Sequence, residues 1–175
     1  EMLCEKAGLL DILYRYSLIT YGFTHDIGTL ALDYCLPVTL NRIYAYAKHA
    51  GVTILQVERT ILTDLDHGIV GELVCRLWQL PTDITNVVTY HHMPRRAPGD
   101  KVALLVVNAG DRVSWNYYEG LLGNHKLRHD LDSTILSELG LTLDDAREVE
   151  GKLPEMVDQA MELLNIRTIE GTLLS

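Results

Sequence analysis

The sequence is poor in basic residues and has no long apolar run. It carries 15 Lys and Arg against 24 Asp and Glu, for a formal net charge of -9. Phosphate-binding surfaces need an excess of Lys and Arg, so this balance argues against a general binder of nucleic acid or acidic membranes. No apolar run approaches the length of a bilayer span, and no basic stretch precedes an apolar one at the start. We therefore expect a cytoplasmic protein with neither a membrane segment nor a nucleic-acid partner.

Cysteine is also scarce. The three residues, Cys4, Cys35 and Cys75, form no Cys-x-x-Cys pair, and their number is odd. A disulfide framework would need paired cysteines at regular spacing. We expect buried free thiols in a reducing compartment.

Strand signals are nearly absent. The runs VTIL (52–55) and VALLVV (102–107) are short, and each lies inside a longer helical period. With 175 residues and 47% hydrophobic content, the chain can build one sizeable core. These features predict a single all-α domain over residues 1–175. Glu1 falls on what looks like helix interior, so we expect the C-terminal part of a longer protein.

Helix boundaries follow from caps, prolines and glycines. The expected helices are two within 2–23 with a break at 8–11, a buried one at 27–36, then 39–49, a short one from Thr53, 66–78, 82–92, 101–118, a short one ending at Gly140, and a last one from Thr142. Pro154 should kink or divide the last helix. Residues 93–99 should be irregular, and the loop 120–131, with its basic cluster of His125, Lys126, Arg128 and His129, should be solvated.

The stretch from Asp64 to His92 is the most informative. Apolar residues between 66 and 78 recur at three- and four-residue spacing, which predicts one buried helix face. They are Ile69, Val70, Leu73, Val74 and Leu77. Pro81 ends this helix and Thr82 can cap the next, whose Ile84, Val87, Val88 and His91 share a stripe. A short connection between two helices would let His67 approach His91 and His92.

Polar residues that suit a metal ion occupy the breaks of these apolar helices. They are His25, Asp26, His67, His91, His92 and Asp111. A carboxylate at the end of an apolar helix is costly unless a cation or a hydrogen-bond donor meets it. Imidazole and carboxylate together suit iron, zinc or manganese, as one ion or as two sharing an aspartate. A metal-bound water could then attack a phosphoester. Arg95 and Arg96 could bind a phosphate.

Each of these residues also has a structural interpretation. His67 could be a capping or surface residue, and the histidine pair could interact with a helix dipole. Asp111 could pair with a cation or hydroxyl nearby, and His25-Asp26 could cap a helix. A purely structural metal site, tying the hairpin to the His25-Asp26 helix, is a further alternative.

These residues occur in the order His25-Asp26, His67, His91-His92 and Asp111, and this order resembles that of a known family. His25-Asp26-Ile27-Gly28 resembles the HDIG signature of the HD superfamily of metal-dependent phosphohydrolases. The segments DHGIVGELVCRLWQLPTDITNVVTYHH (66–92) and LLVVNAGDRVS (104–114) resemble the HDOD family, the regulatory branch of that superfamily in bacterial signalling proteins. The tail LGLTLDDAREVEGKLPEMVDQAMELL (139–164) is similar to the end of such domains. The resemblance implies an all-α HD-domain-like helical bundle.

Three departures bear on catalysis. HD-superfamily enzymes carry another metal-binding histidine upstream, and residues 1–24 contain none. Thr29 stands where the HD-GYP phosphodiesterases usually have a lysine, and MPRRAPGD after His92 does not resemble their GYP segment. Most HDOD domains are thought to be non-catalytic, with eroded ligands, although this chain keeps more of the set.

The resemblance therefore implies a regulatory signal-transduction domain, as in a response regulator. It would act by binding a partner, such as a receiver or sensor domain on the same chain, or a nucleotide-like ligand. The alternative is a metal-dependent phosphohydrolase acting on a nucleotide or cyclic dinucleotide through the six residues.

Overall fold

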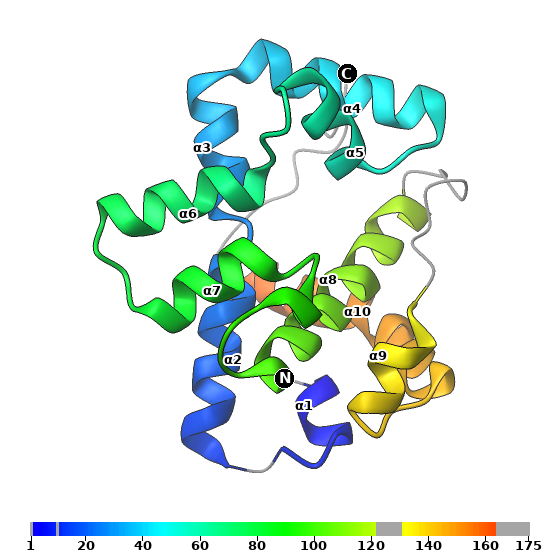
Figure 1. Cartoon of the computed structure of the whole chain (residues 1–175). Helices are drawn as coiled ribbons and strands as arrows, with labels where there is room; N and C mark the ends of the chain where they lie inside the picture. Colours follow the sequence, from blue (N-terminus) through cyan, green and yellow to red (C-terminus); the bar gives the residue numbers. More distant parts are fainter. Residues whose placement is uncertain (1, 10, 122–130, 164–175) are drawn as a thin grey trace.

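The computed structural model describes residues 2–9, 11–121 and 131–163, and within these ranges it is helical with no strand. Figure 1 shows the arrangement. The elements are α1 (Met2–Lys6), α2 (Ile12–Thr24), α3 (Ile27–Cys35), α4 (Pro37–Ala50), α5 (Ile54–Ile61), α6 (His67–Leu77), α7 (Thr82–Tyr90), the 3₁₀ helix η1 (Pro94–Arg96), α8 (Lys101–Leu121), α9 (Ser133–Glu138) and α10 (Leu143–Leu163). The predicted all-α class is confirmed. No helix in these ranges has both the length and the apolar character to cross a membrane.

Side-chain caps set several helix starts. Thr53 and Gln56 form a reciprocal capping box at α5, and the Asp66 carboxylate accepts from the Ile69 N–H at the start of α6. Thr142 and Asp145 exchange hydrogen bonds at α10. The sequence predicted helix starts at all three positions. At α7, by contrast, the N-cap position is Pro81, and Thr82 is the first helical residue.

The main core surrounds α8, which lies near the centre of the molecule (Figure 1). This helix packs against α1, α2, α7, α9, α10 and η1. Every residue from Ala103 to Ala109 is buried, and Val113 and Asn116 are buried beyond them. Leu3, Leu18, Ile135 and Val149 bring the neighbouring helices into the same cluster. A helix that is apolar on most sides suits this central position.

A smaller core holds the hairpin of α4 and α5 at the top of Figure 1. Ile43 and Ala47 of α4 pack against Val57 of α5, with Val52, Ile54 and Leu62 at their edge. The hairpin leads from α3, whose N-terminus follows the His25-Asp26 pair. Its main packing is thus separate from the cluster around α8.

Glycines let α3 and α6 approach closely. A Cβ built on Gly28 would lie 1.8 Å from the carbonyl oxygen of His67 and 2.6 Å from the nitrogen of Gly71. Both atoms are backbone, so neither helix could accommodate a side chain there without moving. This contact brings His67, at the start of α6, beside the residues that precede α3.

The predicted buried face of α6 is wrong. Leu73 and Leu77 are 61% and 78% exposed, and Ile69, Val70 and Val74 are only partly buried. The buried face consists of His67, Gly68, Gly71 and Cys75. Hydrophobic periodicity missed it because close helix packing selects the smallest residues, which add little to an apolar pattern.

Several smaller expectations also need correction. α4 begins at Pro37 rather than Thr39, since proline is well accommodated in a first turn. Segment 27–36 was predicted to be buried, yet Leu30, Tyr34 and Leu36 are exposed. Cys4 and Cys75 are buried free thiols as predicted, but Cys35 is exposed.

Differences also occur in the second half of the chain. Segment 93–99 includes the 3₁₀ turn η1. α8 continues to Leu121, so it extends into the predicted loop, and the basic cluster from His125 to His129 lies outside the described residues. α10 is continuous through Pro154, so it is not divided there.

Candidate metal centre

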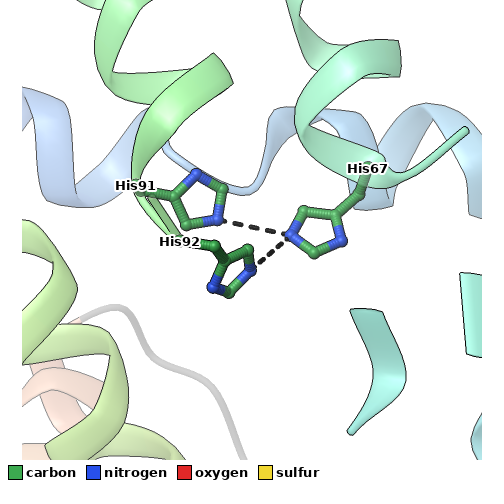
Figure 2. A group of neighbouring side chains, drawn as sticks. All are labelled: His67, His91 and His92. Atoms are coloured by element: carbon green, nitrogen blue, oxygen red, sulfur yellow. Dashed lines mark hydrogen bonds between the residues drawn. The ribbon is translucent and has the colours of Figure 1, made fainter. Parts of the chain in front are cut away.

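Three histidines from one helical hairpin meet at its open end. His67 is the first residue of α6, His91 follows the last residue of α7, and His92 is next to it. The Nε2 atom of His67 lies 3.3 Å from Nε2 of His91 and 2.8 Å from Nε2 of His92 (Figure 2). His67 and His91 are buried, and His92 is partly buried. The predicted meeting of these residues is present.

His25 and Asp26 reach the same place from the α2–α3 junction. Asp26 Oδ1 lies 3.6 Å from Nε2 of both His67 and His91, and Asp26 Oδ2 lies 3.1 Å from Nε2 of His25. The rings of His25 and His91 meet edge to face with centroids 5.0 Å apart. Two compact groups result, one of His67, His91 and His92, the other of His25, Asp26 and His91. His91 belongs to both.

Asp111 lies at the edge of this cluster. It comes from α8, which packs against both α2 and α7. Its carboxylate is 3.7 Å from Nε2 of His25 and 3.9 Å from Nδ1 of His92. It is therefore near the cluster, but it belongs to neither compact group.

Hydrogen bonds on the far side of each ring orient three of the histidines. The Nδ1 atoms of His25 and His91 lie 2.7 and 2.8 Å from the carbonyl oxygens of Gly22 and Val88. A carbonyl only accepts, so both Nδ1 atoms carry the proton. Nδ1 of His67 donates in the same way to the carboxylate of Glu58, at 2.6 Å. In the neutral rings, the lone pair is on Nε2, the nitrogen that faces the cluster.

The cluster's electrostatics separate the histidines into two kinds. Burial opposes charge on His25 and His67, yet their carboxylate partners raise both pKa values, that of His25 to about 10. Burial and neighbouring positive charge lower the pKa of His91 to about 4 and that of His92 to about 2. Burial would raise the pKa of Asp26, but His25 and then the other imidazoles hold it well below its usual range. The site therefore contains carboxylates, two imidazoles that bind a proton readily (His25 and His67) and two that stay neutral (His91 and His92).

The donor set fits a divalent transition metal. Nitrogens bound to one ion at 2.0–2.1 Å lie about 3.0 Å apart when adjacent in an octahedron, and the distances from His67 to His91 and His92 are close to this. Nε2 of His25 is buried without a well-directed hydrogen bond, and the carboxylates of Asp26 and Asp111 lie 3.1 and 3.7 Å from it. A nitrogen in these surroundings favours a proton, or a metal cation in its place. Imidazole with carboxylate suits iron, manganese or zinc.

Two supporting residues were not recognised as part of the site from the sequence. Glu58 is fully buried on α5 and contacts His67. Asn108, also fully buried, donates to the carbonyl of His91 at 2.7 Å and accepts from Nε of Arg112 at 3.2 Å. Asn108 stood out as a polar residue in an apolar helix. Glu58 gave no signal, because glutamate is common on exposed helix faces.

A cavity of about 170 Å³ adjoins the cluster. Asp26, His67, His92 and Asp111 contribute to its wall, together with Thr29, Tyr44, Thr53, Ile54, Leu55, Arg112 and Trp115. The cavity thus lies between the α4–α5 hairpin and α8.

The predicted phosphate ligands do not line this cavity. Arg95 instead pairs with Glu138 at 2.6 Å and donates to Thr134 at 2.7 Å, and Arg96 is exposed on η1. The cationic side chain in the wall is that of Arg112. The sequence missed it because its position depends on how α8 packs.

Comparisons with known proteins agree with this architecture. The HDOD domain model matches residues 1–94 of the 175. A protein of Treponema pallidum (strain Nichols) named "Uncharacterized protein" is 22% identical over 99 residues, which are 57% of this chain and 19% of the relative. The chain therefore spans about a fifth of that curated relative's length. No solved structure matches significantly. Because the family match covers more than half of the chain, the chain belongs to the HDOD domain family.

Proposed function

We propose that this HDOD domain is a regulatory signal-transduction domain, in the bacterial cytoplasm, whose histidine cluster binds one or two divalent metal ions. The observation that carries the proposal is the convergence of three histidines. The Nε2 atoms of His91 and His92 lie 3.3 and 2.8 Å from Nε2 of His67. His25 and Asp26 would complete the ligand set, and Asp111 would be an outer ligand. Such a convergence of lone pairs is unfavourable in a cluster that serves packing alone.

A regulatory role agrees better with the ligand set than catalysis does. The histidine that HD-superfamily enzymes carry upstream has no counterpart in residues 1–24. A binding domain needs only a site whose occupation changes the relative stability of two arrangements. Here a ligand in the cavity would contact the α4–α5 hairpin on one side and α8 on the other. A receiver or sensor domain on the same chain, or another signalling protein, would read the change.

The cavity favours a nucleotide-like ligand. Tyr44 and Trp115 offer aromatic surface and Arg112 offers a cation, while Asp26 and His92 connect the same wall to the metal site. A phosphate bound near the ion could also contact Arg112. The aromatic side chains could contact a planar ring.

The second candidate is a metal-dependent phosphohydrolase acting on a nucleotide or cyclic dinucleotide. It is favoured by one observation, that the cluster opens to the cavity through His92 and the half-exposed carboxylate of Asp26. A bound ion would supply Lewis acidity and an acidic water for attack on a phosphoester. His25, Asp26, His67, His91, His92 and Asp111 would hold the ions, and Arg112 would orient the phosphate.

One experiment separates the two candidates. Protein reconstituted with Mn²⁺ or Fe²⁺ is tested for binding of a nucleoside monophosphate by calorimetry and for hydrolysis of bis(p-nitrophenyl) phosphate and a cyclic dinucleotide. The regulatory proposal predicts metal-dependent binding with no turnover above that of His91→Ala/His92→Ala protein. Metal-dependent turnover that is lost in His67→Ala protein would instead establish the phosphohydrolase.

A further inference from the structure

Glu58 is a buried acid that touches a candidate metal ligand without facing the cluster. Its side chain is fully buried on α5, although most residues of that short helix are in contact with solvent. Oε2 accepts from the backbone N–H of His67 at 3.0 Å and lies 2.6 Å from Nδ1 of the same residue. A fully buried carboxylate is costly, so its retention beside one imidazole needs a reason.

From this contact we propose that Glu58 is a positioning residue for the metal ion, an inference that rests on the proposed metal site. Its carboxylate holds His67 from behind, keeps the proton on Nδ1 and points the Nε2 lone pair at His91 and His92. A carboxylate hydrogen-bonded to the outer nitrogen of an imidazole also makes that imidazole a stronger metal ligand. His25 and His91 have only backbone carbonyls in this role, so His67 is the one anionically supported ring among these three.

A helix cap alone does not explain the contact. α6 already has a cap, because Asp66 accepts from the N–H of Ile69 and also pairs with Arg59 at 2.7 Å. Asp66 lies next to His67 in sequence and is almost fully buried, but its carboxylate bonds to Ile69 and Arg59. Of these two acids, Glu58 contacts the imidazole of His67 and Asp66 does not.

The position of Glu58 also links two parts of the fold. It belongs to the α4–α5 hairpin, whose small core is separate from the one around α8. Through Glu58 and Arg59, the hairpin is joined to His67, the first residue of α6, and to Asp66, its N-cap. An ion that orders His67 would thereby also hold the hairpin that forms one wall of the cavity.

The test compares Glu58→Gln and Glu58→Ala with Asp66→Asn in the full chain. Co²⁺ affinity is measured by visible absorption titration, and the proton position on His67 is read in the ion-free protein by long-range ¹H–¹⁵N correlation. We expect Co²⁺ to bind about 10–100-fold more weakly to Glu58→Gln protein, and more weakly again to Glu58→Ala protein. The Co²⁺ affinity of Asp66→Asn protein should lie within about 3-fold of the wild-type affinity, because the Asp66 carboxylate does not contact the His67 ring. His67 should carry its proton on Nδ1 in wild type and lose this preference in Glu58→Ala protein.

The outcomes are distinct. Wild-type Co²⁺ binding that Glu58→Gln leaves unchanged would overturn the role of Glu58 while the metal site stands. Equal losses in Glu58→Gln and Asp66→Asn proteins would also overturn it, since a general effect of buried charge would then suffice. Failure of wild type to bind Co²⁺ would overturn the metal site and this inference together. Should Glu58→Ala protein not fold, the Glu58→Gln comparison alone decides, because that change conserves side-chain size.

Discussion

Nε2 of His67 and Nε2 of His92 lie 2.8 Å apart, although the two residues come from opposite ends of a helical hairpin. Two neutral imidazoles repel when both lone pairs face each other, so a proton or a metal ion must lie between them. His67 keeps its proton on Nδ1, where Glu58 accepts it, so in the ion-free protein the proton between the two rings belongs to Nε2 of His92. A divalent ion would replace that proton and recruit His91 as well.

The contact between α3 and α6 should tolerate no side chain at Gly28. A Cβ there would lie 1.8 Å from the backbone oxygen of His67, so Gly28→Ala should reduce the free energy of unfolding by about 3 kcal/mol. Urea denaturation followed by circular dichroism measures the change. Gly151→Ala is the matched control on the open side of α10, where a Cβ meets nothing within 4 Å. It should leave stability unchanged or raise it by about 0.5–1 kcal/mol. Equal effects of the two changes would contradict the close packing.

The close packing of α3 on α6 also separates the features that the sequence predicts from those that it does not. The caps at Thr53, Asp66 and Thr142 were predictable because a capping side chain acts within a few residues of its own position. The buried face of α6 was not, since Gly68 and Gly71 are invisible to an apolar pattern. The meeting of His67 with His91 and His92 was predictable from the hairpin. Glu58 and Arg112 depend on how distant helices pack, which no local pattern records.

The ion pairs that Lys6 of α1 forms with Asp145 and Glu148 of α10 should weaken in acid. Hydrogen bonds from Thr142, and then Lys6 at 3.0 Å, lower the pKa of Asp145 from 3.8 to about 2. A carboxyl group with a depressed pKa stabilises the fold fully above its ordinary pKa and loses this effect as the pH falls through the folded value. Asp145→Asn should therefore lower Tm above about pH 5, and the difference from wild type should shrink towards pH 2. Asp158→Asn, an exposed change on the same helix, should show no such trend. A Tm difference independent of pH would exclude the charge of Asp145 as its cause.

Arg112, rather than Arg95, should bind the phosphate of a ligand. Arg112 lines the cavity beside the cluster, while Arg95 pairs with Glu138 on the surface. Loss of a charge-assisted hydrogen bond should make a nucleoside monophosphate bind Arg112→Ala protein about 10–100-fold more weakly in the presence of Mn²⁺. Calorimetry should show wild-type affinity for Arg95→Ala protein. Weaker binding to Arg95→Ala than to Arg112→Ala protein would move the phosphate site away from the cavity.

Metal removal should lower thermal stability. A ligand that binds only the folded state at about 100 times its Kd adds about 2.7 kcal/mol, which corresponds to about 5–10 °C in Tm for a chain of this size. Dialysis against a chelator should reduce Tm by this amount, and Mn²⁺ should restore it. In His91→Ala/His92→Ala protein the chelator should change nothing. A chelator effect that persists in this variant would place the stabilising ion elsewhere.

Elemental analysis shows directly whether the histidine cluster holds a metal ion. The protein is purified without a histidine tag or chelator, and its metal content is compared with that of His91→Ala/His92→Ala protein. We predict about one or two equivalents of iron, manganese or zinc in wild type and their loss in the variant. Wild-type protein that holds no metal, even after reconstitution with iron and manganese, would exclude the metal site and leave the histidines with a role in packing.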